Sequence, residues 1–204
     1  MKVVIVDYGM GNIKSIVGAL TYVGATDISV SFARHDIIAA DRLILPGVGS
    51  FAKAVNSMHE LNLFEILQQA VVANKKPILG ICLGMQLLGV SSTENGLNKG
   101  LGFVNGIVKK FSSEPDLRIP HVGFDQVQIN PGNKIYEDLT AEMDFYFTHS
   151  FRMNCDDDIG QSYCVYGDKF IASFEVDNIV GTQFHPELSQ TNGLRLLKNF
   201  IEKF

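Results

Sequence analysis

The sequence predicts an α/β fold: a mostly parallel central sheet, helices on both of its faces, and an antiparallel extension. Over the first 90 residues, short runs of Val, Ile and Leu alternate with amphipathic stretches. This alternation is the pattern of parallel strands joined by helices. The second half holds mostly short strand-like runs. No Pro/Ser-rich linker or internal repeat divides the 204 residues, so we expect a single domain over 1–204.

Strands and helices are expected in strict alternation along the first half. The run Lys2–Val6 is almost entirely β-branched, as is typical of a strand buried on both faces. The Gly-containing stretch 7–12 ends it, and apolar residues then recur at helical spacing. Further strands are expected at 28–32, 43–45 and 78–81, and further helices at 13–20, 51–58, 63–72 and 85–88.

The second half predicts the antiparallel extension and one closing helix. Its strand-like runs lie at 107–111, 127–129, 145–147, 163–166, 171–174 and 179–183. The closing helix is expected near 193–204, because Leu194, Leu197, Phe200 and Ile201 share one helical face.

Composition and charge exclude several function classes. Hydrophobic residues make up 46% and charged residues 19% of the chain, which describes a globular protein rather than a disordered one. The net charge of −5 argues against a nucleic-acid-binding protein. No apolar run reaches the roughly 18–20 residues that span a bilayer, and we see no signal peptide. Three cysteines without a CxxC pair predict reduced thiols in a cytoplasmic protein with no metal site.

Cys82 is the candidate nucleophile. It stands between an apolar strand and a helical pattern, with Gly80 two residues before it and Gly84 two residues after it. This is the G-x-Nuc-x-G pattern of a nucleophile elbow, whose glycines allow a sharp strand-to-helix turn. The turn places the thiol at a helix N-terminus, which favours the thiolate. Cys155 and Cys164 lack such a setting and are expected to be structural.

His185 and Glu187 are the candidate base and the carboxylate that orients it. Both lie in the segment GTQFHPE, which follows an apolar run. In an extended backbone, side chains two residues apart point the same way, and Pro186 restricts the backbone between them. A histidine base held by a carboxylate completes the logic of a catalytic triad. The other histidines lack this pattern: His35, His59, His121 and His149.

An oxyanion hole needs two backbone N–H groups near the sulfur. Leu83 directly follows the nucleophile and is one expected donor. The second is expected in the loop 45–51, where Val48 and Gly49 are the candidates. No cofactor is expected, because the chain has no phosphate loop and Lys14 stands at the third glycine position of a dinucleotide fingerprint.

Together, these motifs resemble those of the class I (triad-type) glutamine amidotransferases, most closely the glutaminase subunits of imidazole glycerol phosphate synthase. The resemblance runs nearly end to end, through VDYGMGNIKS, LPGVGSF, PILGICLGMQLL, NKGLGF, FYFTHSF, GTQFHPE and LRLLKNFI. It implies a three-layer, flavodoxin-like fold and the hydrolysis of glutamine to glutamate and ammonia through a thioester on Cys82. It also implies that the glutamine is held by Gly49, Gln86, Ser150 and Phe151.

The resemblance further implies a partner, because a chain filled by this one fold has no acceptor site for ammonia. In histidine biosynthesis that partner is a (β/α)₈-barrel cyclase, with which the glutaminase forms a heterodimer that acts as a lyase. We expect hydrolysis to be slow without it. Three positions near the docking face depart from the family pattern. Phe124 and Asp125 stand where it usually has Trp-Asn, and Leu188 replaces a Lys or Arg.

These departures leave two alternatives open. The same glutaminase chemistry could supply ammonia to a sugar amidotransferase in surface-polysaccharide biosynthesis. A free-standing cysteine γ-glutamyl hydrolase would use the same triad without a partner, although this chain has no obvious insertion for a larger substrate.

Overall fold

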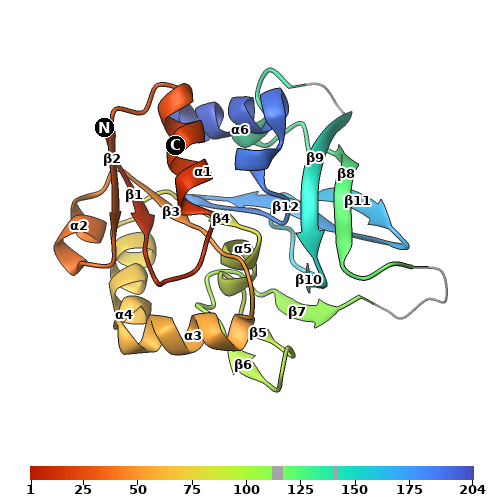
Figure 1. The fold of residues 1–204 in the computed structure, drawn as a ribbon, viewed down its shortest axis with the longest axis horizontal. Helices are drawn as coiled ribbons and strands as arrows, with labels where there is room; N and C mark the ends of the chain where they lie inside the picture. Colours follow the sequence, from red (N-terminus) through yellow and green to blue (C-terminus); the bar gives the residue numbers. More distant parts are fainter. Residues whose placement is uncertain (112–116, 140–141) are drawn as a thin grey trace.

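The computed structural model describes residues 1–111, 117–139 and 142–204. Its central sheet has helices on both faces, as Figure 1 shows. In spatial order its strands are β2 (Asp27–Ser31), β1 (Lys2–Val6), β3 (Arg42–Leu45), β4 (Ile78–Ile81), β13 (Ile179–Thr182), β12 (Asp168–Val176), β11 (Ser162–Tyr166), β8 (His121–Gln128) and β9 (Glu142–His149). The strands from β2 to β13 run parallel, and those beyond β13 are antiparallel. The predicted fold class is confirmed.

A smaller sheet lies beside the central one and consists of β10 (Phe151–Asn154), β7 (Ile107–Lys110), β5 (Ser91–Ser92) and β6 (Asn98–Lys99). Only one residue, Ser150, separates β9 from β10. The chain therefore passes from the large sheet to the small one within a single residue. The sequence analysis predicted β7 but not the other three strands. Strands β5 and β6 have two residues each and therefore no periodicity, whereas the alternating apolar and polar side chains of β10 were overlooked.

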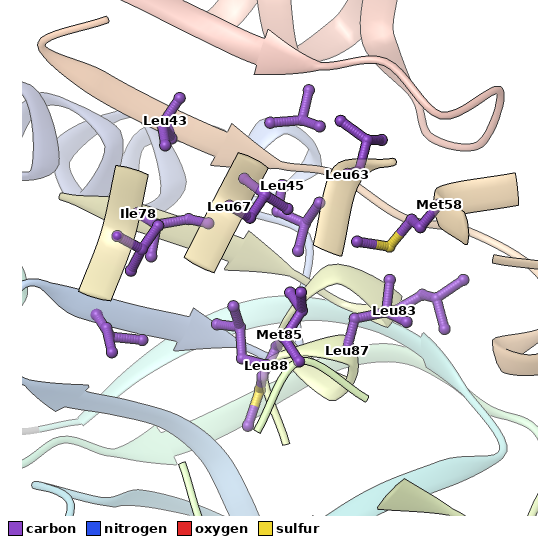
Figure 2. Close-up of a cluster of buried hydrophobic side chains, with 14 of the residues drawn as sticks. Leu43, Leu45, Met58, Leu63, Leu67, Ile78, Leu83, Met85, Leu87 and Leu88 are labelled. Atoms are coloured by element: carbon purple, nitrogen blue, oxygen red, sulfur yellow. The ribbon is translucent and has the colours of Figure 1, made fainter. Parts of the chain in front are cut away.

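Side chains of the parallel strands alternate between two cores. In β1, Val4 and Val6 belong to one buried cluster, whereas Val3 and Ile5 belong to the other. Helices α1 (Ile13–Tyr22) and α6 (Gln190–Lys203) cover the second cluster. The first, part of which Figure 2 shows, is covered by α2 (Arg34–Ala39), α3 (Phe51–Glu60), α4 (Leu63–Leu67), the π-helix η1 (Gln68–Ala73) and α5 (Leu83–Leu87).

Most predicted elements of the first half match the observed ones to within a few residues. One helix, α2, was not predicted, because it is six residues long and buries only Ile37. The helix predicted at 63–72 is divided, since the backbone changes from α-helix to π-helix at Gln68.

Among the residues that the structure describes, no helix has both the length and the apolar character needed to cross a bilayer. Within the same residues, no group of three or more His, Cys, Asp or Glu side chains could hold a metal ion. The three cysteines are free thiols.

Candidate active site

Cys82 lies at a strained turn between β4 and α5. Its backbone has φ 52° and ψ −108°, a region that residues with a side chain rarely adopt and that costs about 1–3 kcal/mol. The neighbouring glycines are packed too closely to carry a side chain. A Cβ on Gly80 would lie 2.7 Å from the backbone nitrogen of Met85, and one on Gly84 would lie 1.8 Å from the carbonyl oxygen of Leu45. The two glycines are therefore present for the predicted reason, because this turn tolerates only glycine at both positions.

The sulfur of Cys82 lies between two polar groups. The carbonyl oxygen of Thr148 is 3.9 Å away and accepts from the thiol, while Nε2 of Gln183 donates to the sulfur at 3.7 Å. Gln183 is fully buried, and its Oε1 accepts a hydrogen bond of 3.0 Å from Nε2 of Gln86. Because Gln86 donates to that oxygen, the amide of Gln183 has its NH₂ group toward the sulfur.

Gln183 was not among the residues predicted for the site. The signal lies in the strand register: β13 pairs parallel with β4 so that Thr182 faces Ile81. Gln183 and Cys82 are the next residues of these two strands and are therefore neighbours. The run 179–183 was expected in the antiparallel extension, whereas β13 pairs parallel with β4, so neither this pairing nor its register was predicted from the sequence.

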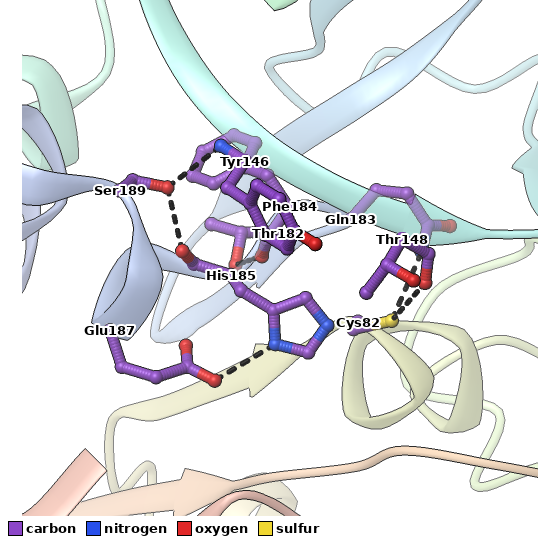
Figure 3. A network of polar contacts seen from close by, with 9 residues as sticks. All are labelled: Cys82, Tyr146, Thr148, Thr182, Gln183, Phe184, His185, Glu187 and Ser189. Carbon is purple, nitrogen blue, oxygen red and sulfur yellow. Dashed lines mark hydrogen bonds and ion pairs between the residues drawn. The ribbon is translucent and has the colours of Figure 1, made fainter. Parts of the chain in front are cut away.

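The structure brings His185 and Glu187 together. Nδ1 of His185 and Oε1 of Glu187 are 2.8 Å apart. Figure 3 shows the imidazole ring of His185 between Glu187 and Cys82. The expected extended backbone was wrong in detail: β13 ends at Thr182, and Pro186–Leu188 form the 3₁₀-helix η3. A tight helical turn, with proline in its first position, presents the carboxylate to the ring.

Backbone contacts hold the imidazole ring of His185 in place. The N–H of His185 donates to the carbonyl oxygen of Tyr146 at 2.9 Å. Its own carbonyl accepts from Oγ of Ser189 at 2.6 Å, and the N–H of Tyr146 donates to the same Oγ at 2.9 Å. These bonds tie the start of η3 to β9, the strand that also carries Thr148.

Burial and charge favour the protonated form of His185. The side chains of His185 and Glu187 are 2% and 1% exposed. Burial alone lowers the pKa of His185, but its contacts with Cys82 and Glu187 outweigh this effect and raise the pKa to about 10. Nε2 of His185 has no hydrogen-bond partner among the described residues and is the nitrogen nearer the sulfur in Figure 3. An imidazolium in this position favours a thiolate on Cys82.

The other two thiols have the opposite environment. Burial raises the pKa of Cys164 to about 12, and the nearby charge of Asp125 adds to this effect. Burial, together with Asp157 and Asp156, also raises the pKa of Cys155. Neither thiol is suited to act as a nucleophile at neutral pH.

A cavity of about 320 Å³ opens over the sulfur. Its wall contains the expected oxyanion-hole and glutamine-binding residues, together with others that the sequence did not indicate: Val48, Gly49, Cys82, Leu83, Gln86, Glu94, Pro120, Thr148, His149, Ser150 and Phe151. Leu83 is the first residue of α5, and Gly49 has φ 102°, a conformation that favours glycine.

Glu94 is the one carboxylate in this wall. Its Oε2 accepts a hydrogen bond of 2.8 Å from the N–H of Phe51, the first residue of α3. Glu94 therefore lies at the positive end of a helix, where a carboxylate is stabilised. Glu94 was not predicted, because it lies in the loop between β5 and β6, two strands of two residues each that have no recognisable sequence pattern.

The chain is similar to known proteins in sequence and in structure. A family model described as glutamine amidotransferase class-I matches residues 4–204. The chain is 45% identical over 202 residues to imidazole glycerol phosphate synthase subunit HisH 2 of Vibrio vulnificus, covering 99% of this chain and 94% of that protein. It is 44% identical over 199 residues to subunit HisH 1 of Campylobacter jejuni, covering 98% of each.

One further relative and two solved structures are also similar to this chain. The chain matches 34% of the chloroplastic imidazole glycerol phosphate synthase hisHF of Arabidopsis thaliana at 42% identity. PurLQS from Thermotoga maritima has a similar structure, with a TM-score of 0.75 and 20% identity over 99% of this chain and 98% of that one. The Trypanosoma brucei CTPS glutaminase domain with bound acivicin gives a TM-score of 0.71 and 15% identity, covering 98% and 92%. These two structures show the shared fold.

Proposed function

Because this chain belongs to the class I glutamine amidotransferases, we propose that residues 1–204 act as one glutaminase domain. It is the glutaminase subunit of imidazole glycerol phosphate synthase and hydrolyses L-glutamine to glutamate and ammonia for histidine biosynthesis. One observation carries the chemical part of this proposal: a strained nucleophile elbow faces a buried His–Glu pair beneath a small cavity. The three free thiols agree with the cytoplasmic location that we also propose.

The first half-reaction forms a thioester. The thiolate of Cys82 attacks the side-chain amide carbon of glutamine, and the carbonyl oxygen becomes an oxyanion that accepts hydrogen bonds from the N–H of Leu83 and of Val48 or Gly49. His185 gives its proton to the amide nitrogen, the C–N bond breaks, and ammonia leaves. Each oxyanion donor of this kind contributes about 10²–10³ in rate.

The second half-reaction regenerates the enzyme. Neutral His185 takes a proton from water as the oxygen attacks the thioester carbon, so a second oxyanion forms in the same place. When it collapses, the C–S bond breaks and glutamate is released. The sulfur leaves as a thiolate, which the amide of Gln183 stabilises by its hydrogen bond, and the imidazolium is restored. Glu187 holds the tautomer of the ring throughout.

The cavity wall matches the two ends of glutamine. Gly49, Gln86 and the backbone of Ser150 and Phe151 surround the substrate near the sulfur. We assign the α-ammonium group to Glu94, the carboxylate of this wall.

Glu94→Gln tests the assignment of Glu94. The glutamine amide can still accept from the N–H of Phe51, so α3 keeps its cap, but the charge opposite the ammonium is lost. The KM for glutamine should rise about 10- to 100-fold with little change in kcat, because a hydrogen bond between charged groups contributes about 1.5–3 kcal/mol to both substrate and transition state. Steady-state kinetics measure this, with the exposed Glu60→Gln as the control. An unchanged KM would place the ammonium elsewhere.

The partner is proposed to dock on an exposed apolar face near the cavity. This face consists of Val122 and Phe124 on β8, which are 56% and 47% exposed, and Leu188 in η3, which is 38% exposed. Phe124 and Leu188 are two of the positions that depart from the family pattern. The contact proposed here is apolar, in place of the ion pair that a basic residue at position 188 would form. The partner is a cyclase subunit, and we propose that it is a (β/α)₈ barrel.

Stimulation of hydrolysis by the partner tests this function. Glutamate release by the purified chain should be slow alone and rise at least 100-fold with a histidine-pathway cyclase carrying its nucleotide ligand, on the order of one oxyanion donor brought into place. A sugar amidotransferase from surface-polysaccharide biosynthesis serves as the comparison partner. Stimulation by that enzyme and not by the cyclase would be consistent with glutamine hydrolysis but would contradict the assignment to histidine biosynthesis.

A further inference from the structure

A chain of hydrogen-bonded side chains runs from the outside of the antiparallel extension to the wall of the cavity. Oδ2 of Asp125 lies 2.6 Å from Nε2 of His121. Nδ1 of His121 lies 3.1 Å from Nε2 of His149, and Nδ1 of His149 lies 2.8 Å from the carbonyl oxygen of Phe151. The two imidazoles are buried, whereas the side chain of Asp125 is 40% exposed. The chain thus connects the protein surface to a backbone group of the cavity wall.

The hydrogen bonds of this arrangement require three protons on the ring nitrogens, one more than two neutral histidines carry. A carbonyl oxygen only accepts, so Nδ1 of His149 carries a proton, and an ionised carboxylate only accepts, so Nε2 of His121 carries another. The contact between the two rings needs a third proton, on one nitrogen or the other. Two neutral imidazoles hold only two. The third proton makes one ring an imidazolium, whose charge Asp125 balances. If this proton moves onto Asp125, the three side chains still hold three protons in total.

The surroundings place the extra proton at His121 rather than at His149. Burial lowers the pKa of His149 to about 3, so this ring stays neutral. The ring of His121 is stacked between Phe147 and Tyr166, with centroids 4.8 Å and 3.9 Å away and interplanar angles of 21° and 19°. Aromatic faces attract a cation. The short nitrogen–oxygen distance of 2.6 Å to Asp125 favours a charge-assisted hydrogen bond, since such bonds are shorter than neutral ones.

Other charged groups near these hydrogen-bonded side chains also affect the protonation of the two imidazoles. His185 and Arg152 both face His149 and lower its pKa further; Arg152 itself pairs with Asp168 at 2.9 Å. Cys164 lies near Asp125. At His121, burial lowers the pKa below its ordinary value, and the hydrogen bond and charge of Asp125 oppose this lowering only in part. The extra proton therefore depends on Asp125 and is lost as the pH rises.

We propose that Asp125, His121 and His149 are positioning residues that share three protons and hold the carbonyl of Phe151 in place for glutamine. This inference rests on the proposed function, in which that backbone lines the glutamine site. The same carbonyl accepts a hydrogen bond of 3.0 Å from Nε2 of Gln86, so it is held from two sides. Loss of the third proton breaks one link of the chain and loosens this side of the cavity.

Two substitutions of Asp125 test the proposal. In Asp125→Asn the amide NH₂ donates to Nε2 of His121, so the chain needs only two protons. In Asp125→Ala the outer link is missing. For the unchanged protein, the KM for glutamine should rise about three- to tenfold between pH 5.5 and pH 8, the range that one hydrogen bond of typical strength gives. Asp125→Asn should show a low KM at both pH values, and Asp125→Ala a high one at both. The kcat should change little. Asp144→Asn, on the exposed face of β9, is the matched control.

A second readout does not depend on activity. Nitrogen-15 NMR of the imidazoles should show both nitrogens of one ring protonated at pH 5.5 in the unchanged protein and only neutral rings at that site in Asp125→Asn. This titration would report on the hydrogen-bonded side chains even if no glutamine were hydrolysed. Failure of the proton-sharing proposal can therefore be told apart from failure of the proposed function. Neutral rings at pH 5.5 in the unchanged protein, or a KM in Asp125→Ala that follows the unchanged pH profile, would overturn the proposal.

Discussion

Replacing Cys82 by Ala is expected to abolish glutamine hydrolysis, with a loss on the order of 10⁵–10⁶ in kcat, the cost typical of removing a nucleophile from a triad. Without the sulfur no thioester forms, and the oxyanion donors and His185 have no acyl group to act on. The fold should be retained, because both side chains are small and the backbone conformation of residue 82 is the same. Glutamate release, measured in the presence of the cyclase, gives the result directly.

The matched control for this change is Cys164→Ala. Cys164 is also buried, but it lies in β11, away from His185, so its loss should lower stability slightly and leave hydrolysis unaffected. Cyclase binding should persist in Cys82→Ala, since the nucleophile lies beneath the cavity and not on the apolar face. Hydrolysis that survived Cys82→Ala would show that another group performs the attack.

Replacing Glu187 by Gln is expected to lower kcat about 10²- to 10⁴-fold, as in other triads that lose the charge of the third member. The carboxylate is almost fully buried, and only Oε1 has a hydrogen-bond partner among the described residues. Its charge is balanced by the imidazolium of His185. The isosteric amide keeps the shape but removes the charge that favours the imidazolium.

The pH dependence separates this electrostatic role from a structural one. The pKa of His185 is raised to about 10, in part by Glu187. Activity that requires the imidazolium is therefore retained up to alkaline pH and is lost as the pH rises through that pKa. In Glu187→Gln the pKa falls, so the alkaline limb of the pH–rate profile should move to lower pH, while the thermal midpoint stays close to that of the unchanged protein. An unmoved alkaline limb would contradict this role. Glu137→Gln, which breaks only an exposed pair with Lys203, is the control.

The sequence predicted the parallel half of the fold well because that half has a strong physical pattern. Strands such as Lys2–Val6 are apolar throughout, since both of their faces are covered, and Gly80 and Gly84 mark a turn that no other residue fits. The small sheet could not be predicted in the same way. Strands of two residues, such as β5, have no periodicity, and they form because the neighbouring chain supplies hydrogen-bond partners. Tertiary contacts define them.

The residues of the candidate site also differ in whether a local sequence pattern predicts them. Cys82, His185 and Glu187 could be proposed from local motifs, because each lies beside the element that positions it. Gln183 and Glu94 reach the site through strand register and loop packing, which a single sequence does not reveal. Asp125 was noted only as a departure from the family pattern near the docking face. The structure shows it hydrogen-bonded to His121, four residues earlier in β8, a contact that no motif in the sequence indicates.

The central claim is that glutamine is hydrolysed through a thioester on Cys82, and trapping that intermediate tests it most directly. The chain and its cyclase would be quenched in acid during turnover of glutamine and digested, and the peptides analysed by mass spectrometry. We predict a glutamyl group on the peptide that contains Cys82, released by hydroxylamine and missing when the thiol is alkylated beforehand. A glutamyl group on a different residue, or full hydrolysis after complete alkylation of Cys82, would contradict the account.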